Sequence, residues 1–462
     1  MSAFWTAEAV SRAVGARVAG DWVASGVSID TRTLAPGDLF VALEGPNRDG
    51  HAFVADALQR GAAAALVARL PEGVDDPAAL AVVADTQAGL EALGRAGRRR
   101  STARIVGVTG SVGKTGTKEA LRHVLSREGP THASAASHNN HWGVPLSLAR
   151  LPEAASFGVF EMGMNHAGEI RALTHQVRPH VALITAVGPA HLENFPSVAA
   201  IADAKSEIFE GLERDGIAII NRDSEHFDRM RGHAERSRAG RIVSFGRHPA
   251  ADWCLEELRA AEECSDVVVR HGRQSIAYRL GVPGEHLVSN SLAVLAVVDA
   301  LGADVGRAAG ALADLRASAG RGERRRITLP GGSATLLDES YNANPTSMCA
   351  ALAVLGRAPG RRIAVLGDML ELGPTTGDLH AGLAAPVEQA GVDLVFTCGP
   401  QMQHLHEALP PGRRGCHAQD SAALAPALLD ALRPGDAVLV KGSLGSRMAR
   451  VVTALTGAGA AR

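Results

Sequence analysis

A glycine-rich segment that begins at residue 107 sets the framework of this chain. It reads Gly107-Val-Thr-Gly-Ser-Val-Gly-Lys-Thr-Gly-Thr117, follows the apolar run Ile105 to Thr109, and opens the amphipathic stretch Thr115 to Leu125. A glycine turn between a strand and a helix exposes backbone N–H groups that can surround phosphate oxygens. The pattern departs from the strict phosphate loop because Val108 stands where the first glycine belongs.

The segment predicts a nucleoside triphosphate site, and the alternative is a glycine-rich turn with an incidental lysine. Lys114 would reach the β- and γ-phosphates, and the Thr115 hydroxyl would hold Mg²⁺. The residues that would contact the nucleotide here are Gly110, Ser111, Val112, Gly113, Lys114, Thr115 and Gly116.

Apolar strands alternate with helical stretches between residues 103 and 318. The strand candidates after the loop are Gly158 to Met162, Val181 to Val187 and Ile217 to Ile220. This alternation indicates a parallel, doubly wound sheet. The segment Trp253 to Leu280 has short alternating runs and predicts a small antiparallel appendage. We therefore expect a central ATP-binding domain over residues 103–318, with a P-loop-type, mostly parallel sheet.

A smaller α/β domain is expected before it, over residues 1–84. Its strand candidates are Val27 to Asp30, Leu39 to Leu43 and Ala62 to Val67, with a helix over His51 to Arg60. The charge run Arg98 to Arg100 then interrupts the pattern, and it predicts a solvated linker.

A third α/β domain is expected over residues 320–462, because 462 residues allow about three domains. The cluster Arg324 to Arg326 marks its beginning. Its buried-strand candidates are Ala334 to Leu337, Ile363 to Leu366, Leu394 to Thr397 and Ala437 to Val440. Helices between these strands predict a dinucleotide-fold-like outline.

The composition excludes several classes of protein. Lys and Arg number 47 against 49 Asp and Glu, so a partner such as nucleic acid or an anionic membrane is not expected. No apolar run reaches about 18 residues, and charged residues interrupt the first 20 positions, which argues against membrane insertion and a signal peptide. The five cysteines are odd in number and lack zinc spacing, which favours free thiols in the cytoplasm.

Two strand-end side chains are candidates for the nucleotide site. Glu161 ends one strand and His191 follows the next, and ligands bind beyond the carboxyl ends of the strands in such sheets. A carboxylate suits Mg²⁺. The alternatives are an acid at the start of a helix for Glu161 and a loop or capping histidine for His191. Lys205, taken alone, looks like an exposed helix lysine.

Motifs along nearly the whole chain carry a family resemblance. They are Asp30-Thr-Arg32, Pro36-Gly-Asp-Leu-Phe-Val-Ala-Leu43, Thr109 to Thr115, Asn139-Asn-His-Trp-Gly-Val-Pro145, Glu161-Met-Gly-Met-Asn-His-Ala-Gly-Glu169, Ala190-His-Leu-Glu193, Ala204-Lys-Ser-Glu-Ile-Phe209, Gly284-Glu-His286 with Asn290, and Asp338-Glu-Ser-Tyr-Asn-Ala-Asn-Pro345. With these, the chain resembles the Mur ligases, the ATP-dependent amide-forming enzymes of peptidoglycan synthesis. The last motif favours the branch that adds D-alanyl-D-alanine.

The resemblance implies roles at named positions. Lys114, His191 and Lys205 would be catalytic, Thr115 and Glu161 would hold one Mg²⁺, and His191 and Lys205 would help to hold a second, with Lys205 carbamylated by CO₂. On the nucleotide, His286 and Asn290 would lie near adenine, and Arg321, Asp338 and Glu339 near the ribose and phosphates. The UDP-sugar peptide would meet Thr31, Arg32, Asn139 and Asn140, and the dipeptide would meet Tyr341, Asn342, Asn344, Lys441 and Ser443. Glu339 and Thr31 depart from the aspartate and the serine common in relatives.

The implied reaction joins a carboxylate to an amine. ATP would phosphorylate the terminal carboxylate of UDP-N-acetylmuramoyl-tripeptide, and the amine of D-alanyl-D-alanine would displace phosphate from the acyl phosphate. Two Mg²⁺ ions and Lys114 would offset the charge on the transferring phosphoryl group. A monomer that closes its three domains around the substrates is expected.

Three alternatives stay open at this point. One is the ligase that adds the third stem residue, although the Asp-Asn-Pro-Arg motif of its diaminopimelate-adding versions is absent here. The second is a nucleotide-dependent binding module, which would need the loop but not Glu161, His191 and Lys205 together. The third is a chain that kept the fold and lost the activity.

Overall fold

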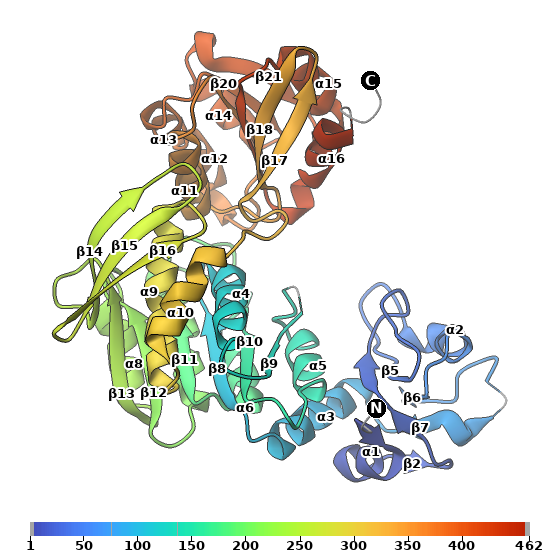
Figure 1. Cartoon of the computed structure of the whole chain (residues 1–462). Helices are drawn as coiled ribbons and strands as arrows, with labels where there is room; N and C mark the ends of the chain where they lie inside the picture. The colour runs from blue at the N-terminus through green and yellow to red at the C-terminus, as the bar shows by residue number, and fades with distance from the viewer. Residues whose placement is uncertain (1–3, 75, 136, 458–462) are drawn as a thin grey trace.

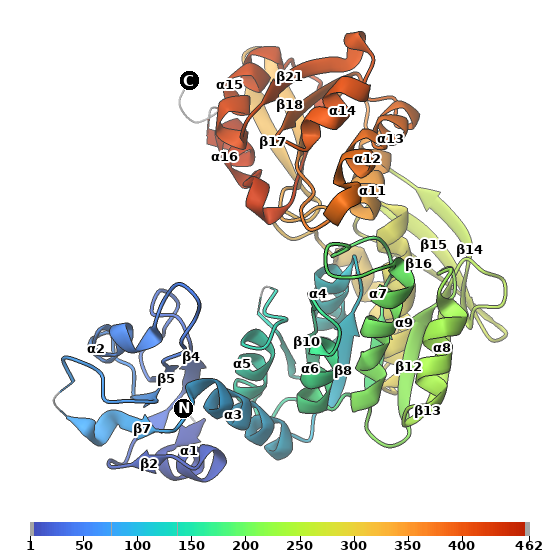
Figure 2. The same cartoon turned by 180° about the vertical axis from the view of Figure 1, so that it is seen from behind.

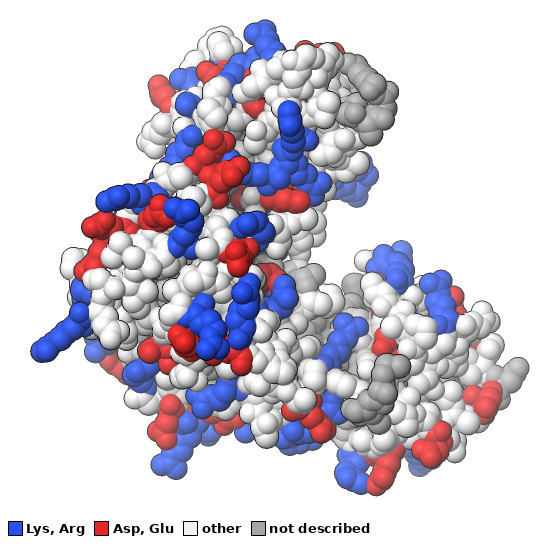
Figure 3. Space-filling view, in the orientation of Figure 1, with Lys and Arg blue, Asp and Glu red and all other residues white. Residues whose placement is uncertain are grey.

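The structure, a computed structural model, describes residues 4–74, 76–135 and 137–457. Within these ranges the chain forms three α/β units, each around its own main sheet (Figures 1 and 2). The first and third units join the central unit at different places, and an open gap separates them on the face shown in Figure 3. The predicted α/β class with three domains is therefore confirmed. The outermost residues of the predicted first and third domains, 1–3 and 458–462, lie outside the described residues.

The first unit has a sheet in the order β2–β7–β6–β5–β4, in which the neighbouring strands are parallel except for β2 and β7. A short antiparallel pair, β1–β3, lies beside it. The elements are β1 (Trp5–Thr6), α1 (Ala7–Val14), β2 (Arg17–Val18), β3 (Val23–Ala24), β4 (Gly26–Ser28), β5 (Asp38–Val41), α2 (Val54–Gln59), β6 (Ala64–Val67) and β7 (Leu80–Val82). The predicted strands are present here with different bounds, since β4 and β5 begin one residue earlier and end two residues earlier and β6 begins two residues later, and the predicted helix begins as a 3-10 turn over Gly50–Phe53.

The predicted solvated linker at Arg98 to Arg100 is wrong. Helix α3 (Thr86–Arg100) runs through it and joins the first unit to the central one (Figure 2). Arg98 is only 6% exposed, and its guanidinium donates hydrogen bonds of 2.8 and 2.9 Å to the carbonyl oxygens of Val177 and Arg178. Those carbonyls end a helix, where cations are favoured and partners are needed. The charge of Arg98 therefore lies inside the junction of the first and central units, where it binds carbonyl oxygens.

The central unit has a sheet of nine strands among the described residues, in the order β16–β15–β14–β13–β12–β11–β8–β10–β9. Its strands are β8 (Arg104–Thr109), β9 (Thr131–Ala133), β10 (Phe157–Glu161), β11 (Val181–Ile184), β12 (Gly216–Asn221), β13 (Ala239–Gly246), β14 (Trp253–Ala260), β15 (Ser265–His271) and β16 (Gln274–Leu280). Its helices are α4 (Lys114–Leu125), α5 (Gly143–Ala149), α6 (Glu169–Val177), α7 (Val198–Ser206), α8 (Phe227–Glu235), α9 (Glu285–Ala300) and α10 (Val305–Ala311).

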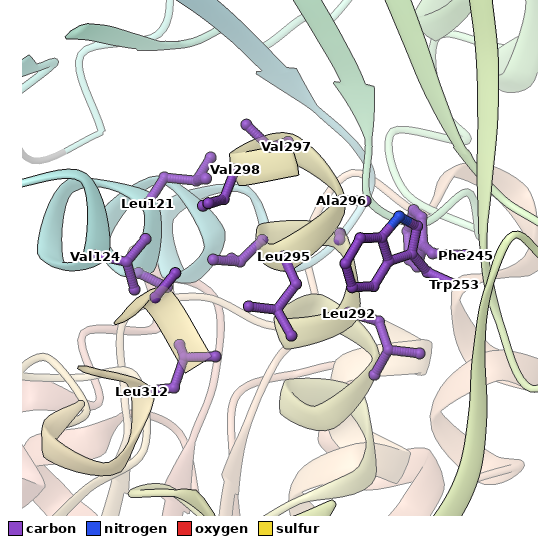
Figure 4. Packing of buried hydrophobic residues seen from close by; sticks show 14 of the residues in the cluster. Leu121, Val124, Phe245, Trp253, Leu292, Leu295, Ala296, Val297, Val298 and Leu312 are labelled. Atoms are coloured by element: carbon purple, nitrogen blue, oxygen red, sulfur yellow. The ribbon is translucent and has the colours of Figure 1, made fainter. Parts of the chain in front are cut away.

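The segment 253–280 is antiparallel as predicted, but it is not a separate appendage. Strand β14 pairs in parallel with β13 through Phe245 and Trp253, so the hairpin strands extend the main sheet. Trp253 is fully buried and packs with Phe245 and with Leu292 of the apolar helix α9 (Figure 4). Because this core is continuous, helix α9 and the loop before it have a fixed position beside the phosphate loop.

The third unit has a sheet in the order β17–β18–β22–β19–β20–β21, parallel except for the β17–β18 hairpin. The strands are β17 (Glu323–Leu329), β18 (Gly332–Glu339), β19 (Arg362–Gly367), β20 (Leu394–Cys398), β21 (Arg414–Ala418) and β22 (Ala437–Lys441). The helices are α11 (Pro345–Leu355), α12 (Thr376–Ala381), α13 (Ala384–Gln389), α14 (Met402–Ala408), α15 (Ser421–Ala431) and α16 (Ala449–Gly457). Arg324 to Arg326 belong to its first strand, β17.

No helix in the part of the chain that the structure describes has the length and apolar character needed to cross a bilayer.

Candidate active site

A cavity of about 610 Å³ lies where the carboxyl end of the central sheet faces the third unit. Its central-unit wall is formed by residues 111–116, Ser137, Asn139, Glu161, Thr185, Ala186, Ala190, His191, Asn221, and residues 286, 287, 289 and 290. Its third-unit wall is formed by Gly320, Arg321, Glu339, residues 341–344, 346, 347, 350 and 351, Leu370, Glu371, Lys441, and residues 443–445. Both walls come from the same chain, and they meet over the loop that the sequence predicted to bind phosphates.

The glycine loop between β8 and α4 has the backbone that a phosphate site needs. Gly110 and Gly113 have φ of 154° and 83°, a region that L side chains rarely adopt. A side chain at Gly113 would also lie 2.7 Å from the Asn290 amide nitrogen. Helix α4 begins directly after the loop, so its unpaired N–H groups and the positive end of its dipole face the cavity.

Lys114 lies at the start of α4 and folds back over the loop. Its Nζ donates a 2.7 Å hydrogen bond to the Gly110 carbonyl oxygen. Burial lowers the pKa of Lys114, the Glu161 carboxylate acts in the opposite direction, and the nearby Arg321 lowers the pKa further. The ammonium is therefore held at the turn that would surround a phosphate.

Glu161 ends β10, the strand next to β8, and its carboxylate meets the loop. One carboxylate oxygen accepts a 2.8 Å hydrogen bond from the Thr115 hydroxyl, and the other accepts a 2.7 Å hydrogen bond from the Asn139 amide. Glu161 is 1% exposed. It does not cap a helix, since α6 begins only at Glu169. The sequence placed Glu161 and Thr115 near each other, and the structure brings them into contact.

Lys205 is buried, in contrast to the exposed position that its helix alone suggested. It lies in the last turn of α7 and is 1% exposed. Burial and the neighbouring Lys114 ammonium hold the pKa of Lys205 well below its ordinary value. Among the described residues, none forms a hydrogen bond or ion pair with its ammonium.

His191 follows β11 and contacts the third unit. Its Nδ1 lies 2.5 Å from a carboxylate oxygen of Glu371, and this contact holds the pKa of Glu371 below its usual range. Both residues have left-handed backbone angles, with φ of 59° and 64°. Glu371 was not predicted, because no pattern near residue 371 indicates a contact with residue 191.

The third-unit residues that the sequence predicted form a connected polar wall. The Arg321 guanidinium stacks on the Tyr341 ring at 3.9 Å, and the Tyr341 hydroxyl hydrogen-bonds to Ser137 of the central unit. Lys441 is buried, and its Nζ lies 3.3 Å from a Glu339 carboxylate oxygen and donates a 2.9 Å hydrogen bond to the Asn342 carbonyl oxygen.

Three further third-unit residues have structural contacts. Asn344 caps helix α11, and Ser443 donates a 3.2 Å hydrogen bond to the Ala343 carbonyl oxygen. Asp338 lies below the cavity surface, where one carboxylate oxygen accepts a 2.6 Å hydrogen bond from Ser340. Of the acidic pair, Glu339 alone lines the cavity.

His286 and Asn290 reach the cavity from the first turns of α9. Burial and the nearby Lys441 lower the pKa of His286, and Glu339 acts in the opposite direction. A neutral imidazole ring at this position suits contact with a planar, uncharged base.

Three predicted substrate residues do not line this cavity. Thr31 and Arg32 belong to the first unit, where Arg32 pairs with the Asp30 carboxylate at 2.5 Å. The Asn140 side chain accepts hydrogen bonds of 3.2 and 2.9 Å from the backbone of Trp142 and Gly143 at the start of α5. A substrate that touches the first unit and the phosphate loop together must therefore span the open gap.

Two leucines in the cavity wall were also not predicted from the sequence. Leu370 and Leu444 are 45% and 65% exposed, which is unusual for large apolar side chains. Leu370 lies close to the residue that follows Leu444, since a side chain at Gly445 would lie 2.7 Å from Leu370. Their exposure, which no sequence pattern reveals, adds an apolar patch to a polar cavity.

The donor set fits an ion that also binds a phosphate. Among the described residues, no three His, Cys, Asp or Glu side chains form a cluster that could hold a metal alone. Thr115 and Glu161 offer oxygen atoms 2.8 Å apart beside the phosphate loop. Mg²⁺ characteristically takes one or two protein oxygens and completes its shell with phosphate and water.

Comparisons with known proteins agree with this geometry. The models described as Mur ligase family, catalytic domain, Mur ligase middle domain, and Mur ligase, glutamate ligase domain match residues 23–100, 108–298 and 320–444. The chain is 36% identical over 431 residues to UDP-N-acetylmuramoyl-tripeptide–D-alanyl-D-alanine ligase of Escherichia coli, with 93% of each chain covered.

Two solved structures are similar over nearly the whole chain. A crystal structure of MurF from Acinetobacter baumannii aligns with a TM-score of 0.86 and 31% identity, covering 98% of this chain and 99% of that one. The MurF ligase of Thermotoga maritima, solved in complex with ADP, aligns with a TM-score of 0.79 and 27% identity, covering 94% and 97%.

Proposed function

The chain belongs to the Mur ligase family, and we propose that it is the ATP-dependent ligase that joins D-alanyl-D-alanine to UDP-N-acetylmuramoyl-tripeptide in cytoplasmic peptidoglycan precursor synthesis. The observation that carries the proposal is the cavity in which a phosphate loop with its lysine and a buried carboxylate faces a polar wall of the third unit. A single chain supplies both walls, which supports a monomer as the working unit.

The reaction first makes the carboxylate reactive. The terminal carboxylate of the tripeptide attacks the γ-phosphorus of ATP, which gives an acyl phosphate and ADP. The loop N–H groups and Lys114 stabilise the charge that spreads over the transferring phosphoryl oxygens. The amine of the dipeptide then attacks the acyl carbon, phosphate leaves, and the amine proton is lost to solvent.

Thr115 and Glu161 hold the first Mg²⁺ in this proposal. The ion supplies Lewis-acid stabilisation of the phosphate oxygens when it is bound. Asn139 donates to the second carboxylate oxygen of Glu161 and so fixes the orientation of the carboxylate. This contact gives Asn139 a second role beside binding the peptide substrate.

Lys205 carries a carbamate in this proposal. Burial and the Lys114 cation lower the pKa of Lys205 and so favour its neutral amine, which can attack CO₂ and release one proton. The product is an anion on a long stem, and the Lys114 cation is near enough to act on the charge at this position. The new carboxylate and His191 would help to hold a second Mg²⁺.

Nucleotide and dipeptide occupy adjoining parts of the site, since Arg321 stacks on Tyr341 and Glu339 lies beside Lys441. His286 and Asn290 contact adenine, Arg321 and Glu339 contact the ribose and phosphates, and Asp338 supports this contact from below. Thr31 and Arg32 bind the uridine end, with Asn140 near the sugar peptide. The dipeptide meets Tyr341, Asn342, Asn344, Lys441 and Ser443, with Leu370 and Leu444 beside its methyl groups.

A coupled assay tests the proposal. Phosphate release is measured with ATP, UDP-N-acetylmuramoyl-tripeptide and either D-alanyl-D-alanine or single amino acids, and the product mass is determined. The proposal predicts turnover and a pentapeptide product with the dipeptide alone. Turnover with only a single amino acid would assign the chain to the branch that adds the third residue. Full ligation activity of the Lys205→Ala variant would contradict the role proposed for Lys205.

A further inference from the structure

One contact between the central and third units that the reaction scheme leaves unused is the pair of His191 and Glu371. These residues are 180 positions apart, and each lies in a loop at the end of a strand. The Nδ1-to-carboxylate distance of 2.5 Å is short for a hydrogen bond between a ring nitrogen and an oxygen. The pair is only partly exposed, with 24% of the His191 side chain and 48% of the Glu371 side chain reachable by solvent.

The loop that carries His191 rests on the third unit at several points. The Glu193 N–H donates a 3.3 Å hydrogen bond to the Glu371 carbonyl oxygen. Gly373, with φ of 65°, approaches the Glu193 backbone so closely that an added side chain would lie 3.2 Å from its Cα. A side chain at Gly188 would lie 2.8 Å from the Thr346 hydroxyl, so a second approach precedes the histidine.

The backbone at the pair is held in an uncommon conformation. His191 and Glu371 are two of only five non-glycine residues with positive φ among those that the structure describes. Such a conformation is costly for a residue with a side chain and persists where its surroundings require it. Here it brings both side chains into the same contact.

The contact with Glu371 decides which nitrogen of the His191 ring can bind a ligand. A neutral imidazole has one N–H donor and one nitrogen with a free lone pair. With the Nδ1 proton donated to Glu371, the lone pair belongs to Nε2, and none of the described residues donates a hydrogen bond to Nε2. His191 lines the cavity, so the nitrogen with the lone pair is the one left for a ligand there.

We propose that Glu371 is a positioning residue, which fixes the tautomer and orientation of the His191 ring. Because Glu371 belongs to the third unit, it completes the site only when that unit is docked on the central one. The proposal rests on the proposed function for the role of His191 as a ligand of the second metal ion. Carboxylates commonly orient histidine ligands through the ring nitrogen that faces away from the ion. Here the unit that receives the amine would supply that carboxylate.

The test uses the full-length protein and three variants. Glu371→Ala removes the acceptor, and Glu371→Gln keeps an oxygen acceptor but no charge. Glu388→Gln is the control, because Glu388 is an exposed glutamate of the same unit whose side chain forms no hydrogen bond or ion pair with any described residue. Ring-nitrogen NMR of isotope-labelled histidine at alkaline pH, with His191 assigned from a His191→Gln spectrum, identifies the protonated nitrogen.

The wild type, Glu371→Gln and the control are expected to show His191 protonated at Nδ1, and Glu371→Ala is expected to show a mixture of tautomers. Ligation by Glu371→Ala should have a kcat about 10- to 100-fold lower, the range seen when such a partner is removed, with the KM for the dipeptide nearly unchanged. An unchanged tautomer in Glu371→Ala overturns the proposal. A raised KM with unchanged kcat also overturns it, because it would mean that the contact only docks the units. The NMR readout of the His191 tautomer does not require ligation activity. Failure of this proposal can therefore be distinguished from failure of the proposed function.

Discussion

The two lysines of the cavity region show how environment gives one side chain two kinds of chemistry. Lys114 lies beside Glu161 and the loop carbonyl of Gly110, so its cation has partners where phosphate charge would develop. Lys205 has burial and a second cation around it, which favours its neutral amine. The surroundings of each side chain, rather than the residue type, therefore make Lys114 a cation suited to phosphate and Lys205 an amine suited to CO₂.

Lys114→Ala should lower the rate of ligation by about 10²- to 10³-fold, since one preorganised stabilising cation is lost. Steady-state kinetics with all three substrates check this. Arg122→Ala is the matched control, because Arg122 lies on the same helix but is exposed, and Glu119 is its one ion-pair partner among the described residues. Equal rates for Lys114→Ala and the control would refute the assigned role.

His180 predicts a pH dependence of stability. Its Nδ1 accepts a 2.9 Å hydrogen bond from the Ile105 N–H, and burial lowers the pKa of His180 to about 4. An unfolded histidine has a pKa of about 6.5, so between these values the unfolded chain binds a proton that the folded chain does not. The free energy of unfolding should therefore fall as the pH drops from about 6.5 to about 4, by at most about 2 kcal/mol at about pH 5, because solvent screens the partly exposed ring.

Urea unfolding at neutral and acidic pH checks this dependence. His180→Asn keeps an acceptor near the position of Nδ1 but does not titrate, so its stability should change less with pH than that of the wild type. If both proteins lose the same free energy on acidification, His180 is not the group responsible.

Among the elements, α3 shows where local pattern fails. A run of three arginines is usually solvated, yet the helix continues through it because Asp85 caps its start and the Arg98 guanidinium satisfies carbonyls at the end of α6. The antiparallel strands were recognised from their alternation, but their continuity with the main sheet depends on the pairing of Phe245 with Trp253. Periodicity identifies strands; it does not identify their partners.

Arg98→Ala should lower the free energy of unfolding by about 2 to 4 kcal/mol, because the buried Val177 carbonyl oxygen and the partly buried Arg178 carbonyl oxygen lose their donor and Glu213 loses a partner. Arg99→Ala is the control, since Arg99 is the exposed neighbour on the same helix. Chemical denaturation of both variants measures the difference. Equal stabilities would mean that the junction does not depend on Arg98.

At the scale of the whole molecule, what the sequence predicted was local and what it missed depends on how the units meet. The phosphate loop is encoded by neighbouring residues, and Glu161 meets Thr115 because adjacent parallel strands end at the same edge. The contact between His191 and Glu371 depends on the placement of the third unit, which no short pattern encodes.

Closure of the units should accompany substrate binding. Thr31 and Arg32 lie outside the cavity, and a gap separates the first unit from the third (Figure 3), so a substrate held at both ends must draw the units together. X-ray scattering should show a smaller radius of gyration when a non-hydrolysable ATP analogue and UDP-N-acetylmuramoyl-tripeptide are added together. Scattering curves that remain unchanged with both ligands would count against closure.

The central claim is that this cavity activates a carboxylate by phosphorylating it. The most direct measurement uses tripeptide substrate whose terminal carboxylate carries isotopically labelled oxygen, with ATP and D-alanyl-D-alanine present. If an acyl phosphate forms, one labelled oxygen is transferred to the released phosphate for each amide bond made, and mass spectrometry of the phosphate detects it. Amide formation with unlabelled phosphate would contradict the account.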